Sequence, residues 1–239
     1  MNYNNPEFDR AMNTSEFGMA LSVPALMRKV YVWMTLALVI TGFTAYGVAT
    51  SPGIRQMIFA NQIVFWGLII AEFALVIGLS AAINRLSLTT ATLMFVIYSV
   101  INGATLSCIF LLYTMSSIAS VFFITAATFG VMSLIGIVTK TDLSGMGKML
   151  LMALIGLVIA TVVNMFMKSS GLAMIINYIG VLVFVGLTAY DTQKIKQMLY
   201  MAPSDESGQK LALLGALSLY LDFVNLFLYL LRILGSRKE

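Results

Sequence analysis

Long apolar segments alternate with short polar breaks along most of the chain. A helix needs about 20 apolar residues to span a bilayer. Seven segments meet this requirement, namely 30–49, 63–83, 91–112, 118–138, 149–167, 172–190 and 211–231. The breaks carry Pro, Gly, Ser and Asn residues that are typical of turns. The pattern therefore predicts an all-α membrane protein, a bundle of seven transmembrane helices with consecutive helices antiparallel.

Composition supports the same class. The chain has 239 residues, of which 60 % are apolar and 10 % charged, and its mean hydropathy is +0.94. A soluble domain has about 25 % charged residues, so this chain has too few charges to cover a water-exposed surface. We expect a polar N-terminal tail over residues 1–29, a transmembrane domain over 30–232 and a short basic tail over 233–239.

The distribution of Lys and Arg predicts the orientation, because cytoplasmic loops are enriched in these residues. With the N-terminus inside, nine lie on the inner side: Arg10, Arg28, Lys29, Arg85, Lys140, Lys148, Lys194, Lys196 and Lys210. The outer side holds Arg55 and Lys168, and the tail adds Arg232, Arg237 and Lys238. We therefore expect a cytoplasmic N-terminus. The basic tail fits poorly: either seven full crossings place it outside, or the last segment is re-entrant and returns it inside.

Several kinds of chemistry are disfavoured by the sequence. It contains no histidine and one cysteine, Cys108, which excludes Ser-His and Cys-His catalysis and an intrachain disulfide. Zinc and copper sites would lack their usual ligands. The chain has no nucleotide-binding glycine motif and no basic patch interleaved with aromatic residues, so we expect neither an enzyme nor a nucleic-acid partner, and no bound cofactor.

Three of the ten acidic residues fall within the predicted spans or directly at the end of one. Glu72 lies in the middle of the second span, Asp222 in the middle of the seventh, and Asp191 at the inner end of the sixth. A charged carboxylate at a helix centre costs roughly 2.5–3.5 kcal/mol on insertion scales. Such acids are protonated, lie in water or meet a cation, and each outcome makes their state depend on pH, ions or conformation.

The seventh segment carries a stripe of small and polar residues. Gly215, Ser218, Asp222, Asn225 and Tyr229 fall within about 80° of one another on a helix, and such a stripe must face the bundle interior. Asp222 and Asn225 then either join helices by hydrogen bonds or belong to an ion or proton path. Carboxylate and amide oxygens suit Ca²⁺, Na⁺ and H⁺.

Two stretches resemble a known family. SLYLDFVNLFLYLLRILG (218–235) resembles the signature of the Bax inhibitor-1 family, also called the transmembrane Bax inhibitor motif family. GLTAYDTQKIK (186–196) is similar to the motif of its sixth helix. The resemblance covers about residues 25–235 and implies a seven-helix bundle with the last helix in the centre. The short tails suggest a bacterial-type member in the inner membrane.

The resemblance also implies a function. Bacterial members are similar to pH-sensitive calcium leak channels, with calcium ions and protons as partners. In them an aspartate pair on the sixth and seventh helices shares a proton, and an arginine contacts the pair when the pore is closed. The pair maps to Asp191 and Asp222, which would also be the tentative calcium ligands. The arginine maps to Arg85, and a pore acid of the second helix maps to Glu72. Together with Asp222 and Asn225 of the polar stripe, Glu72 is expected to form the ion path.

Two alternatives remain open. Animal members of the family suppress cell death at the endoplasmic reticulum, and some bacterial relatives bind and restrain a membrane protease. This chain would then be a membrane interaction protein that modulates a protease or a stress response. Its N-terminal tail would make the contact and its buried acids would be structural. A proton- or sodium-coupled transporter would use the same acids but needs a substrate pocket.

Overall fold

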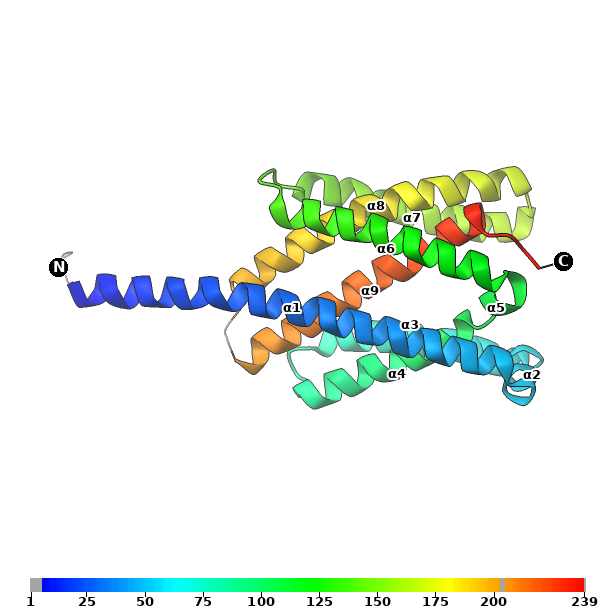
Figure 1. Cartoon of the computed structure of the whole chain (residues 1–239), viewed down its shortest axis with the longest axis horizontal. Coiled ribbons are helices and arrows are strands. Elements are labelled where there is room, and N and C mark those ends of the chain that lie inside the picture. Colours follow the sequence, from blue (N-terminus) through cyan, green and yellow to red (C-terminus); the bar gives the residue numbers. More distant parts are fainter. Residues whose placement is uncertain (1–5, 203–204, 239) are drawn as a thin grey trace.

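The protein is a bundle of long helices (Figure 1). The computed structural model describes the backbone of residues 6–202 and 205–238 and the side chains of residues 23–202 and 205–238. Its helices are α1 (Pro6–Thr50), α2 (Pro52–Phe59), α3 (Gln62–Ala82), α4 (Leu88–Leu106), α5 (Ile109–Leu112), α6 (Met115–Val138), α7 (Ser144–Met167), α8 (Ser170–Tyr200) and α9 (Glu206–Leu234). Seven segments are long and apolar enough to cross a membrane, as the hydrophobic pattern predicts.

Polar side chains start several of the helices at the predicted breaks. The side chains of Asn61, Ser87 and Ser169 accept hydrogen bonds from the first free backbone N–H groups of α3, α4 and α8. Such caps satisfy donors that have no partner within the helix itself. The short turn residues of the sequence therefore fix where each crossing begins.

The observed helix bounds differ from the predicted ones at three places. Helix α1 starts at Pro6 and runs through the segment predicted as a polar tail. The third crossing is interrupted after Leu106, where the Ser107 hydroxyl donates to the Ala104 carbonyl at 2.7 Å. Helix α8 continues ten residues past the predicted end at residue 190, because Thr192, Ile195 and Leu199 give its last third a buried face.

The last crossing is one continuous helix, which settles the choice left open for the C-terminal tail. The 29 residues of α9 span about 43 Å, more than the hydrocarbon core of a bilayer. After α9 the chain pairs with the start of α6, where the Thr114 N–H donates to the Ser236 carbonyl at 3.1 Å. The N- and C-terminal ends of the described chain therefore lie at opposite ends of the bundle (Figure 1), and a re-entrant last segment is wrong.

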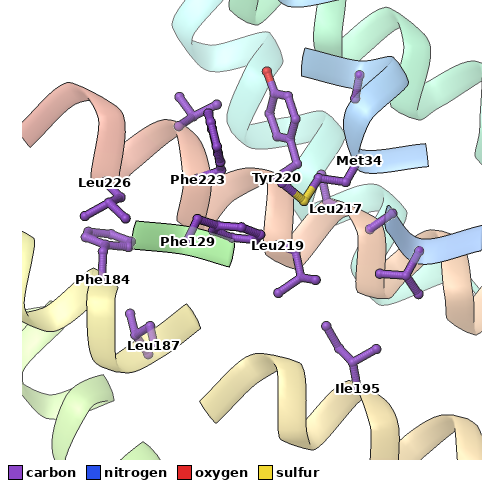
Figure 2. Packing of buried hydrophobic residues seen from close by; sticks show 14 of the residues in the cluster. Met34, Phe129, Phe184, Leu187, Ile195, Leu217, Leu219, Tyr220, Phe223 and Leu226 are labelled. Atoms are coloured by element: carbon purple, nitrogen blue, oxygen red, sulfur yellow. The ribbon is translucent and has the colours of Figure 1, made fainter. Parts of the chain in front are cut away.

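Helix α9 is the most buried of the seven crossings. Of its most apolar stretch 67 % is buried, against 6 % for α3 and for α7. It packs against α1, α4, α6 and α8. Figure 2 shows its residues Leu219, Tyr220 and Phe223 among side chains from α1, α6 and α8. Because lipid tails are as apolar as leucine, close packing of this kind holds the bundle together.

Candidate functional site

Two aspartates from neighbouring helices meet inside the bundle. Asp191 on α8 and Asp222 on α9 place their carboxyl groups close enough to interact with each other. Asp222 is 5 % exposed, and its Oδ2 atom has no partner among the described residues. An ionised carboxylate only accepts hydrogen bonds, so two carboxyl groups bond to each other only when one carries a proton.

Asp191 lies well before the end of its helix. Because α8 extends to Tyr200, nine further residues, or about 13 Å of helix, separate Asp191 from the end of α8. The cation that acts on its carboxylate is Lys194, one turn further along α8. The exposed Lys194 ammonium lies 5.8 Å from the centre of the Tyr190 ring.

The structure does not bring Arg85 to the aspartate pair. Arg85 lies in the turn between α3 and α4, and its side chain is exposed. The ion pair found in the described residues joins Lys210 and Glu206 at 3.2 Å. The turn lies at the end of the bundle, whereas Asp191 lies in the body of α8, so Arg85 holds a solvent-facing position in this conformation.

A second polar site surrounds Glu72 on α3. Its carboxylate accepts a hydrogen bond from the Thr105 hydroxyl at 2.6 Å and from the Asn102 amide at 3.4 Å. Glu72 and Asn225 line one cavity of about 460 Å³, together with Asn102 and Thr105. The structure therefore brings together Glu72 and Asn225, two of the three residues predicted for an ion path.

The third predicted path residue, Asp222, does not line this cavity. Its carboxyl faces α8, while Leu221, Val224 and Asn225 present the neighbouring face of α9 to the cavity. The polar stripe of α9 thus serves two sites. One face meets Asp191, and the other closes the Glu72 cavity.

A hydrogen-bonded chain links the Glu72 cavity to the centre of the bundle. The Tyr220 hydroxyl donates to the Asn102 Oδ1 atom at 2.9 Å and lies 2.7 Å from the Thr41 hydroxyl. Thr41 has one hydroxyl proton, which it donates either to Tyr220 or to the Ser99 carbonyl 2.9 Å away. The chain joins α1, α3, α4 and α9 and fixes the Asn102 amide, whose Nδ2 atom faces Glu72.

The sequence reasoning missed these supporting residues. Asn102 and Thr105 stand three residues apart in an apolar span, a spacing that places them on one helix face. That spacing was the sequence feature that could have predicted a polar site on this helix. Gln193 on α8 was also missed: it accepts from the Leu143 N–H at 2.8 Å and donates to the Thr141 carbonyl at 2.9 Å, which fastens the α6–α7 connection.

The acids do not form a dense metal cage. Among the described residues, no three His, Cys, Asp or Glu side chains lie close enough together to hold a metal ion. Calcium takes about 6–8 oxygen ligands in its tight sites. The Asp191–Asp222 pair supplies two carboxyl groups, so any cation held there would draw most of its ligands from water and carbonyl oxygens.

Comparisons with known proteins agree on one family. The family described as "Inhibitor of apoptosis-promoting Bax1" (Bax1-I) matches residues 23–239. The inner membrane protein YbhL of Escherichia coli K12 is 53 % identical over 214 residues, which cover 89 % of this chain and 92 % of YbhL. An uncharacterised Borreliella burgdorferi protein is 46 % identical over 214 residues, 89 % of this chain and 92 % of its own length. The uncharacterised protein RP147 of Rickettsia prowazekii is 46 % identical over 215 residues, 89 % of this chain and 90 % of its own length.

Proposed function

The chain belongs to the Bax inhibitor-1 family, and from this premise we propose that it is a pH-sensitive calcium leak channel gated by the Asp191–Asp222 pair. The single observation that carries the proposal is the close approach of these two carboxyl groups inside a membrane-spanning bundle. Two close buried carboxylates cannot both ionise easily. Loss of the shared proton therefore places two like charges side by side and drives α8 and α9 apart.

The Glu72 cavity supports a cation path. Carboxylate, amide and hydroxyl oxygens converge there from Glu72, Asn102, Thr105 and Asn225, and hard cations prefer oxygen ligands. One carboxylate binds calcium weakly, which suits passage because an ion must also leave its site. In the conformation described, α9 separates this cavity from the aspartate pair, and we assign this conformation to the closed state.

We also infer that the N-terminal end of the bundle faces the cytoplasm. Nine of the fourteen Lys and Arg residues belong to that end, and such an excess is typical of the cytoplasmic side. The relative YbhL is an inner membrane protein, so the bacterial inner membrane is the membrane we propose. Calcium would then enter from the outer end of the bundle.

Calcium entry into proteoliposomes of the purified protein tests the proposal. Glu72→Gln should reduce entry, because the amide removes the charge that attracts the cation and leaves the cavity nearly unchanged in size. Glu206→Gln is the matched control, since Glu206 is an exposed acid at the start of α9. Equal entry through wild type and Glu72→Gln would overturn the path.

A second candidate function is that of a membrane interaction protein that restrains a protease or modulates a stress response. The observation that favours it is the N-terminal part of α1, which extends beyond the other helices in Figure 1 and offers a helix to a partner. Deleting residues 1–22 separates the two functions. Loss of partner capture with intact calcium entry would assign the interaction to this segment. Intact partner capture with reduced calcium entry would leave the channel as the function.

A further inference from the structure

A basic cavity lies at the end of the bundle where α9 ends. Its volume is about 460 Å³. Its polar lining includes Arg232, Arg237, Asn164, Asn177 and Thr161, and none of its described lining residues is acidic. Most of the remaining lining is apolar. The cavity therefore combines hydrogen-bond donors and positive charge with leucine and isoleucine side chains.

The protein holds both arginines at this cavity. The Arg232 guanidinium lies 5.4 Å from the centre of the Tyr229 ring, an arrangement that favours a cation over the ring face. Arg237 belongs to the segment after α9, which pairs with Tyr113. The Lys238 N–H donates to the Leu112 carbonyl at 3.0 Å on one side of Arg237. On the other side, the Ser236 N–H donates to the Ser117 hydroxyl at 2.9 Å.

The charge of this end has no compensation in the described chain. Five cations lie there: Arg55, Lys168, Arg232, Arg237 and Lys238. The helix ends and connections of this end contain no Asp or Glu between residues 46 and 65, 106 and 118, 161 and 176, or 228 and 238. The positive-inside rule depletes Lys and Arg from the end opposite the cytoplasmic one. Glu239 follows Lys238 in the sequence, so five cations stand against one acidic side chain in these stretches, and this excess of positive charge suits an anionic partner.

We propose that this cavity binds the phosphate of an anionic phospholipid. The headgroup phosphate lies against Arg232 and Arg237, because a planar guanidinium matches the geometry of phosphate oxygens. The side-chain amides of Asn164 and Asn177 are further donors. An acyl chain follows the apolar lining formed by Leu228, Leu231 and Ile176. The size of the cavity falls within the range of organic-ligand sites, about 300–1,000 Å³, and exceeds what a free phosphate ion fills.

The proposal does not depend on calcium transport, and its test uses no flux measurement. Delipidated full-length protein in a neutral detergent is titrated separately with dioleoylphosphatidylglycerol, dioleoylphosphatidylcholine and inorganic phosphate. Native mass spectrometry counts the bound molecules. We expect one phosphatidylglycerol to bind at least about tenfold more tightly than phosphatidylcholine. Inorganic phosphate in excess should not displace it.

Matched charge removals identify the site. Arg232→Gln/Arg237→Gln should lose the preference for phosphatidylglycerol. Arg55→Gln/Lys168→Gln removes the same charge from the same end but outside the cavity lining, and it should keep the preference. An equal loss of the phosphatidylglycerol preference in both double variants would show that the lipid is attracted by the overall positive charge of this end, and it would overturn the site. Displacement by inorganic phosphate would overturn the lipid as its ligand.

The single variant Arg237→Gln keeps the test decisive if the double variant fails to fold, because Arg237 is exposed and lies after the last helix. It should weaken phosphatidylglycerol binding and leave phosphatidylcholine binding unchanged. Wild-type affinity for phosphatidylglycerol in a folded Arg237→Gln protein would remove that arginine from the site and overturn the proposal as stated.

Discussion

Removal of one hydroxyl, in Tyr220→Phe, tests the hydrogen-bonded chain behind the Glu72 cavity. Tyr220 is fully buried, and its hydroxyl contacts both Asn102 and Thr41. The phenylalanine ring keeps the edge contacts with Phe95 and Tyr98, so the change removes polar contacts and little packing.

The expected cost follows from the groups that lose a partner. Without the hydroxyl, the Asn102 Oδ1 atom loses its donor inside the bundle. An unsatisfied buried acceptor costs about 1–3 kcal/mol, so Tyr220→Phe should lower the free energy of unfolding by that amount. The freed amide can also rotate, which weakens its 3.4 Å contact with Glu72. Calcium entry should therefore fall, but less than in Glu72→Gln, because Thr105 still holds the carboxylate.

The assay is unfolding by sodium dodecyl sulfate in mixed micelles, followed by the fluorescence of Trp33 and Trp66. Tyr98→Phe is the matched control. Tyr98 packs beside Tyr220 and is 4 % exposed, and its hydroxyl makes no hydrogen bond among the described residues. Because this control loses no hydrogen bond to a described residue, we expect it to lower the free energy of unfolding by less than Tyr220→Phe does. Equal losses in the two variants, or no loss in Tyr220→Phe, would refute the role given to the chain.

Two further changes test the packing and a helix start. Gly180→Ala would place a Cβ atom 2.7 Å from the Tyr229 ring and should destabilise the protein by about 1–3 kcal/mol. In the control Gly156→Ala the added Cβ atom meets nothing within 4 Å, so this variant should keep its stability. Equal unfolding midpoints for the two variants would contradict the predicted clash at Gly180. Side-chain and backbone hydrogen bonds from Ser144 lower the pKa of Asp142. Its stabilisation is therefore present above the ordinary aspartate pKa of about 3.9 and is lost as pH falls through the lower folded pKa. The difference in thermal midpoint between wild type and Asp142→Asn should shrink on acidification, and a constant difference would refute it.

The hydrophobic pattern was sufficient to predict the seven crossings, because bilayer thickness imposes one length on every span. It failed for the last third of α8. There DTQKIKQMLY is too polar to read as a span, yet Thr192, Ile195 and Leu199 face the bundle. The continuous helix brings Asp191 beside Asp222, a contact that depends on tertiary packing.

The candidate site was predictable in part. The cost of a buried charge pointed to Glu72, Asp191 and Asp222, and the family resemblance paired the two aspartates. Neutral residues do not carry the cost of burying a charge, so the sequence alone did not single out the hydrogen bond between Asn102 and Tyr220. Helical periodicity placed Asp222 and Asn225 on one stripe, but it could not show that α8 covers one side of that stripe and the Glu72 cavity the other.

The pH profile of calcium entry for wild type and Asp222→Asn, from about pH 6 to about pH 8, tests the shared proton most directly. Asparagine keeps the size of the side chain and can donate permanently to Asp191, so it imitates a pair that never releases its proton. We predict that entry through the wild type changes with pH and that entry through Asp222→Asn does not follow this change. An identical profile in both proteins, or wild-type entry no greater than in empty vesicles, would contradict gating by the aspartate pair.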